Sequence, residues 1–95
     1  MQRITVQAYA TLGDILRSRK VEVLTTARTV GELIDFLAER FGASFKERLI
    51  DSQTNELKSL YRIIVNGRNV ESLNKLKTKI CEGDRVLFFP PVGGG

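Results

Sequence analysis

The residues with the clearest chemical potential are the final six, Pro90-Pro91-Val92-Gly93-Gly94-Gly95. Three consecutive glycines pack nothing and raise chain entropy, so a folded domain gains no stability from them. The prolines stiffen the base of the segment, and six extended residues span about 20 Å. Because glycine has no side chain, such a tail can pass through a narrow channel and bring a terminal carboxylate to a nucleotide. We expect residues 1–89 to form the domain that carries this tail, residues 90–95.

Apart from this tail, the sequence has few side chains that could take part in catalysis. The 95 residues include no histidine, which removes the commonest general base and the commonest metal ligand. The single cysteine, Cys81, has no histidine to activate it and cannot form an internal disulfide, so we expect it to be incidental. Glu32, Asp35 and Glu39 are expected on the solvent face of a helix, not in a cleft. The sequence therefore predicts no metal site and no catalytic side chain.

The composition is that of one globular domain. Hydrophobic residues make up 42% and charged residues 27% of the chain, and the formal net charge is +4. Basic runs at 17–20 and 75–79 are short and lack interleaved aromatic residues, so they indicate solvated surface and no nucleic-acid partner. No apolar run has the length of a signal peptide core or a membrane span. We expect a cytoplasmic protein with no membrane partner.

Sequence patterns in the first half of the chain predict two strands followed by a helix. Residues 3–9 (RITVQAY) and 20–24 (KVEVL) alternate apolar and polar side chains, which predicts two half-buried strands joined by a long basic loop. Thr29 begins a T-x-x-E capping box, and an apolar stripe with a helical period follows it. These features predict a helix over Val30–Phe41 that ends at Gly42.

The second half of the chain carries the same kinds of strand and helix signals, but the elements that they predict are shorter. A second capping box, over 44–47, predicts a short helical turn, and the polar stretch 51–55 predicts a loop. Residues 61–65 are a predicted strand that leads into the hairpin dipeptide Asn66-Gly67. A last strand is predicted over 85–89, where two prolines end it.

These elements together predict an α+β fold of the ubiquitin-like β-grasp type. Neither the helix nor the sheet can bury its apolar side alone, so a mixed sheet of four to five strands should pack on one main helix, Val30–Phe41. The side chains predicted to fill the core are Ile4, Val6, Leu33, Ile34, Leu37, Phe41, Ile63, Val65 and Val86.

One sheet face is a candidate partner interface. If alternate residues of the last strand point inward, the open face of the sheet carries Leu87, Phe89 and Ile64. Clustered aromatic and aliphatic side chains on a small domain commonly mark a partner site. In the alternative interpretation, residues 43–60 cover this face.

The sequence resembles the small, sulfur-carrying subunit of molybdopterin synthase, within the MoaD/ThiS-type family of ubiquitin-like sulfur carriers. The resemblance extends over nearly the whole chain and is carried by YATLGDIL, TVGELIDFLAERFG, IVNGRNV and FFPPVGGG. The last of these segments is the most specific. Two features depart from the family pattern: residues 43–60 are longer than in its shortest members, and Gly93 replaces a frequent serine or alanine.

This resemblance implies a reaction at Gly95. An activating enzyme of the ubiquitin-activating type, an adenylyltransferase, would consume ATP and join the Gly95 carboxylate to AMP. A persulfide sulfur donor would then displace AMP and leave a thiocarboxylate. Residues 90–94 would insert into the large subunit of molybdopterin synthase, where the sulfur passes to a pterin precursor. The chain itself would bind no cofactor and would be the non-catalytic subunit.

Two other classes of function also fit the sequence. A protein modifier, or a carrier that donates sulfur to tRNA, would use the same glycine tail, and only its partners would distinguish it. A β-grasp interaction module, with RNA binding as one form, would not need a free Gly-Gly end.

Overall fold

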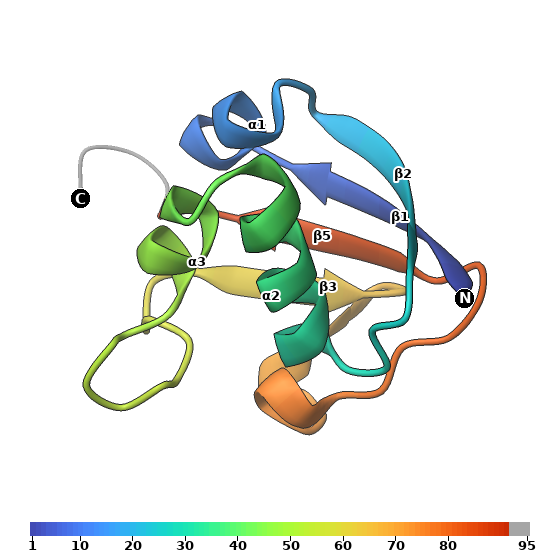
Figure 1. Cartoon of the computed structure of the whole chain (residues 1–95). Coiled ribbons are helices and arrows are strands. Elements are labelled where there is room, and N and C mark those ends of the chain that lie inside the picture. Colours follow the sequence, from blue (N-terminus) through green and yellow to red (C-terminus); the bar gives the residue numbers. More distant parts are fainter. Residues whose placement is uncertain (92–95) are drawn as a thin grey trace.

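The sheet has five strands in the computed structural model of the chain, which describes residues 1–91. The strands are β1 (Gln2–Ala8), β2 (Lys20–Thr25), β3 (Arg62–Val65), β4 (Arg68–Asn69) and β5 (Arg85–Phe89). Their order across the sheet is β2-β1-β5-β3-β4 (Figure 1). Strands β1 and β5 are parallel, and the other neighbours are antiparallel. The predicted α+β fold with a mixed sheet is therefore confirmed.

The main helix, α2 (Val30–Phe41), has the bounds that its capping box predicts. The Thr29 hydroxyl accepts a hydrogen bond of 3.2 Å from the Glu32 amide. The Glu32 carboxylate accepts from the amide of Arg28, one residue before the expected partner. Gly42 ends the helix with a φ of 134°, a conformation that favours glycine.

The predicted loop between the first two strands is wrong in part, because it contains helix α1 (Thr11–Leu16). Leu12 and Leu16 are buried on its inner side. Gly13, within this segment, is a point of close packing. A Cβ atom at Gly13 would lie 2.8 Å from the Ala8 carbonyl oxygen, so glycine lets the helix rest against the end of β1.

The prediction that the second capping box caps a helix is also wrong. Helix α3 (Ser44–Leu49) includes Ser44, its N-cap is Ala43, and no side chain caps it. Tertiary packing holds this helix in place, since Phe45 and Leu49 are fully buried. The ring of Phe45 meets the ring of Phe88 edge to face, with centroids 5.2 Å apart.

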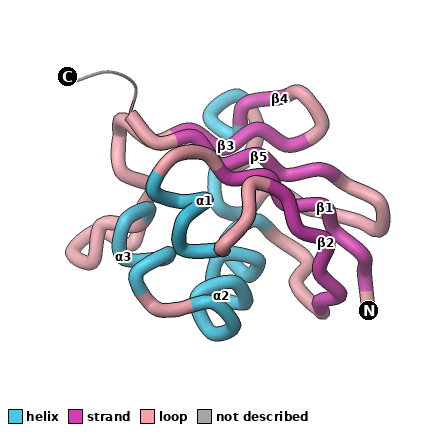
Figure 2. Tube along the Cα trace, turned by 90° about the horizontal axis from the view of Figure 1, so that it is seen from above, coloured by secondary structure: helices cyan, strands magenta, loops and turns pink. Residues whose placement is uncertain are grey.

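Helices α1, α2 and α3 lie on the same side of the sheet (Figure 2). Two 3₁₀ turns, η1 (Val70–Ser72) and η2 (Lys75–Lys77), connect β4 to β5. The core lies between the helices and the sheet, and eight of the nine predicted core residues are buried. Phe41 is the exception, because it occupies the last position of α2 and packs at the margin of the core.

The Asn66-Gly67 turn joins β3 to β4 with positive φ angles of 50° and 85°, as the hairpin dipeptide predicts. None of the helices formed by residues 1–91 is long and apolar enough to cross a membrane.

Candidate functional site

The candidate site is built around β5, the strand that leads into the tail. Val86 and Phe88 are fully buried and face the helices. Leu87 and Phe89 alternate with them, so they lie on the opposite, open face of the sheet. Ile64 of β3 pairs directly with Leu87 across the ladder. The structure thus brings the three predicted interface residues together, each of them half-buried.

The segment 43–60 packs on the helix side of the sheet. Phe45 reaches the core from that side, and α3 lies beside α2 (Figure 2). The rest of the segment folds back on α3: the Lys58 amide donates to the Leu49 carbonyl, and the Lys58 ammonium donates to the Glu47 carbonyl. These contacts place the segment away from the open face.

Tyr9 belongs to the open face and was not among the predicted site residues. Its ring stacks on that of Phe89, with centroids 4.6 Å apart and planes 5° from parallel. The Tyr9 amide donates to the Phe88 carbonyl, and the Gln7 amide group donates to the Tyr9 hydroxyl at 3.3 Å. The signal was available in the sequence, because Tyr9 continues the outward-facing alternation of Thr5 and Gln7.

The tail begins where β5 ends. The end of β5 lies on the side of α1 and α3, away from the N-terminus (Figure 1). Pro90 and Pro91 follow Phe89 directly, outside any regular element, and both are half-buried. The remaining predicted tail residues, Val92, Gly93, Gly94 and Gly95, lie outside the described residues.

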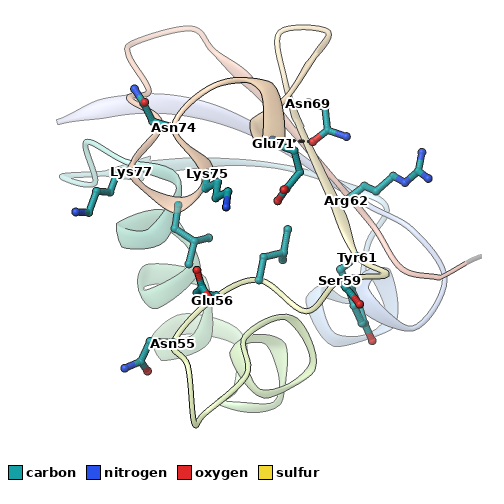
Figure 3. A pocket seen from close by; sticks show the side chains of 12 residues that line it. Asn55, Glu56, Ser59, Tyr61, Arg62, Asn69, Glu71, Asn74, Lys75 and Lys77 are labelled. Carbon is teal, nitrogen blue, oxygen red and sulfur yellow. Dashed lines mark hydrogen bonds between the residues drawn. The ribbon is translucent and has the colours of Figure 1, made fainter.

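A groove of about 720 Å³ lies between residues 55–62 and 69–77 (Figure 3). Charged side chains of both signs line it, among them Glu56, Glu71 and Lys75. The hydrogen bond drawn there is local, from the Glu71 amide to the Asn69 side-chain oxygen at 2.9 Å. The groove holds no cysteine, and no predicted site residue lines it.

Acidic and thiol groups do not gather elsewhere in the described chain. Within residues 1–91 no three Cys, Asp or Glu side chains are close enough together to hold a metal ion. Cys81 is exposed, and its amide donates to the Asp84 carboxylate at 2.7 Å.

The chain is similar to proteins that are named as a sulfur carrier and as a small archaeal modifier. The chain matches the model of the ThiS family over residues 6–95. A protein of Archaeoglobus fulgidus that is named as a sulfur carrier is 35% identical over 75 residues, which cover 79% of this chain and 83% of that protein. Small archaeal modifier protein 3 of Haloferax volcanii is 36% identical over 86 residues, which cover 90% of this chain and 71% of that protein.

Solved structures share the fold. A chain in the crystal structure of the Amycolatopsis orientalis BexX/CysO complex is 28% identical with a TM-score of 0.81, covering 97% of this chain and 99% of that one. A molybdopterin converting factor subunit 1 from Pyrococcus furiosus is 25% identical with a TM-score of 0.71, covering 97% and 100%. The family match spans both the β-grasp domain and the glycine tail, and the chain therefore belongs to the ThiS family of ubiquitin-like sulfur carriers.

Proposed function

We propose that this chain carries sulfur as a thiocarboxylate on Gly95 and donates it for molybdopterin synthesis. The observation that carries the proposal is the family match, which extends through Gly93, Gly94 and Gly95 directly after a strand fixed in the middle of the sheet. The name of the Pyrococcus furiosus structure and the FFPPVGGG segment favour molybdopterin as the destination of the sulfur.

The proposed loading reaction has two stages. The Gly95 carboxylate attacks the α-phosphorus of ATP in an adenylyltransferase, which releases pyrophosphate and forms an acyl-adenylate. The terminal sulfur of a persulfide donor then attacks the acyl carbon and AMP leaves. A thiol cleaves the resulting S–S bond, which leaves the thiocarboxylate on Gly95 and a disulfide on the donor. Because ATP is consumed, we place this loading in the cytoplasm.

The domain positions the reacting carboxylate. Strand β5 is hydrogen-bonded to β1 on one side and to β3 on the other, so the point where the tail begins is held by two neighbours. Pro91 is the last described residue, and the four residues after it can extend ~13 Å. This length allows Gly95 to reach a site inside an adenylyltransferase or inside the large subunit of molybdopterin synthase while the sheet remains outside.

A second candidate function uses the same tail. The Haloferax volcanii relative is named as a modifier protein, which favours conjugation of Gly95 to lysine side chains of other proteins. Donation of sulfur to tRNA would also begin with the same acyl-adenylate. These functions differ from the first in what accepts the acyl group or the sulfur.

Mass spectrometry of the protein from its native host distinguishes these functions. The proposal predicts a form that is heavier by the difference between one sulfur and one oxygen, with the change located at Gly95. Purified thiocarboxylate should then convert a pterin precursor when the large synthase subunit is added. Glycine remnants on lysines of other proteins, with no thiocarboxylate form, would instead support the modifier function.

A further inference from the structure

The turn between β3 and β4 carries a reactive pair of residues, Asn66 and Gly67, both of them exposed. Asparagine is thermolabile because the backbone nitrogen of the next residue can attack its side-chain amide. A Cβ atom at Gly67 would meet nothing within 4 Å, and the Gly67 amide donates no hydrogen bond to another residue of the described chain. The backbone nitrogen of Gly67 is therefore open to solvent and available to react.

The other asparagines of the chain differ in the residue that follows them. Asn55, Asn69 and Asn74 precede a glutamate, a valine and a lysine. Each of these side chains crowds the backbone nitrogen that would have to attack, whereas glycine leaves it uncovered. Asn66 is thus the asparagine of this chain whose neighbour most favours loss of the side-chain amide.

Two hydrogen bonds hold the Asn66 side chain in place. Its amide nitrogen donates to the Asp84 carboxylate at 2.9 Å, and its oxygen accepts from the Arg85 amide at 3.0 Å. Closure of a ring between the Asn66 Cγ atom and the Gly67 nitrogen would turn the side chain away from both partners. The hydrogen bond to Asp84 is charge-assisted and therefore the stronger of the two. Asp84 should thus slow the reaction of Asn66.

We propose that Asn66 is a site of spontaneous deamidation and that Asp84 holds this reaction in check. The Gly67 nitrogen loses its proton and attacks the Asn66 Cγ atom, the bond from Cγ to Nδ2 breaks, and the departing amine gains a proton and leaves as ammonia. The product is a cyclic succinimide. Water then opens either of its two carbonyl–nitrogen bonds, which gives aspartate or isoaspartate. Overall, one water is consumed and one ammonia is released, with no oxidation or reduction.

The product weakens the contact that held the side chain. An aspartate at position 66 places a carboxylate where the Asn66 amide donated, so two carboxylate oxygens would face each other across 2.9 Å and repel. Isoaspartate lengthens the backbone within a tight hairpin turn, which disturbs the register of β3 with β4. Deamidation therefore loosens the join between this turn and the start of β5. This inference is independent of the proposed function.

Ageing of the full-length protein tests the reaction. Purified protein is kept in neutral buffer, peptide mass spectrometry follows conversion at each asparagine, and an isoaspartyl methyltransferase labels the isoaspartate product. We expect conversion at Asn66 while Asn55, Asn69 and Asn74 remain intact. Asp84→Ala should convert about tenfold faster than wild type, because the side chain is released more often. The control, Asp14→Ala, removes an exposed carboxylate from α1 and should stay within about twofold of wild type.

Urea unfolding tests the effect of the product. Asn66→Asp imitates the aspartate form and should raise the unfolded fraction about tenfold. When Asn66→Asp is combined with Asp84→Asn, the amide and the carboxylate exchange places. The hydrogen bond then forms in the reverse direction, and we expect most of the lost stability to return.

The results that would overturn the inference are distinct for each part of it. Conversion at Asn66 no faster than at the other asparagines would remove it as the site. An unchanged rate in Asp84→Ala, or equal acceleration by Asp14→Ala, would exclude the protective role of Asp84. Asp84→Asn, which keeps the size of the side chain, replaces Asp84→Ala in this measurement if thermal melts show that the alanine variant is unfolded. Failure of the exchanged pair to recover stability would exclude the predicted effect of the product.

Discussion

The side chains of Asn66 and Asp84 share a hydrogen bond of 2.9 Å that joins the β3–β4 turn to the turn before β5. The Asn66 side-chain oxygen also accepts from the Arg85 amide at 3.0 Å, and the second Asp84 carboxylate oxygen accepts from the Cys81 amide at 2.7 Å. Two turns far apart in sequence are therefore held together at the start of the strand that leads into the tail.

Two substitutions of Asn66 should separate the contribution of these hydrogen bonds to the free energy of unfolding from the contribution of the backbone conformation at this residue. Asn66→Ala removes the side-chain hydrogen bonds and puts alanine at a φ of 50°, so we expect a loss of roughly 2–3 kcal/mol in the free energy of unfolding. Asn66→Gly removes the same hydrogen bonds but tolerates positive φ, and it should cost about 1 kcal/mol less. Urea unfolding of both variants measures the difference, and a greater loss for glycine would contradict this account.

Gly13→Ala tests the contact between α1 and the end of β1. The added methyl group would lie 2.8 Å from the backbone oxygen of Ala8, which cannot rotate away as a side chain could. We expect a loss of about 1–3 kcal/mol in denaturant melts, although alanine is the better helix former. Asp14→Ala, on the exposed side of the same helix, should change stability by less than ~0.5 kcal/mol. Equal effects of the two substitutions would exclude close packing as the reason for the glycine.

Leu37→Ala tests the core under α2. Leu37 is fully buried, so its truncation should cost roughly 2–5 kcal/mol. Glu39→Ala, an exposed position on the same helix, serves as the control and should stay within ~0.5 kcal/mol of wild type. A loss below ~0.5 kcal/mol for Leu37→Ala in denaturant melts would be incompatible with the packing described above.

Phe89→Ser tests the predicted partner interface on the open face of the sheet. The substitution removes both the stacking on Tyr9 and the exposed part of the ring, so binding to the large synthase subunit should weaken while the fold persists. Phe36→Ser removes a half-buried aromatic ring from the helix side and controls for a general loss of stability. Titration calorimetry gives the two affinities, and unchanged affinity for Phe89→Ser would rule out this interface.

The glycines of the tail should be essential for loading and dispensable for folding. Deletion of Gly94 and Gly95 would leave the carboxylate ~7 Å short of its reaction site, and even ~1 Å of misplacement can cost about 100-fold. ATP–pyrophosphate exchange should therefore disappear. Gly94→Val should act similarly, because a branched side chain does not fit a channel shaped for bare backbone. Both variants should melt like wild type, and exchange at the wild-type rate after the deletion would refute the carrier function.

Local signals predict a large part of this fold. The capping box at Thr29, the apolar stripe of α2 and the Asn66-Gly67 turn each act over a few residues, and each is where the sequence indicates. The errors are local signals that tertiary contacts override. Gly13 packs closely against the end of β1 in a segment that was expected to be a loop, and Ser44 lies inside α3 where a cap was expected.

Long-range relationships were not predictable in the same way. Nothing near Tyr9 specifies a partner 80 residues later, and its stacking on Phe89 follows only once β1 and β5 are known to be parallel neighbours. The alternation that places Leu87 and Phe89 on one face, by contrast, can be read from the strand alone. The sequence therefore indicates the members of the site more readily than their arrangement.

The parallel pairing of β1 with β5 also has a consequence for synthesis on the ribosome. Strand β5 fills the space between β1 and β3, so those two strands each lack a neighbour until residues 85–89 have emerged. A nascent or prematurely terminated chain would expose two unpaired strand edges and the apolar side chains beneath them, which favours aggregation and proteolysis. Completion of the sheet thus coincides with synthesis of the strand that leads into the tail, and quality control would remove chains that end before β5 has been made.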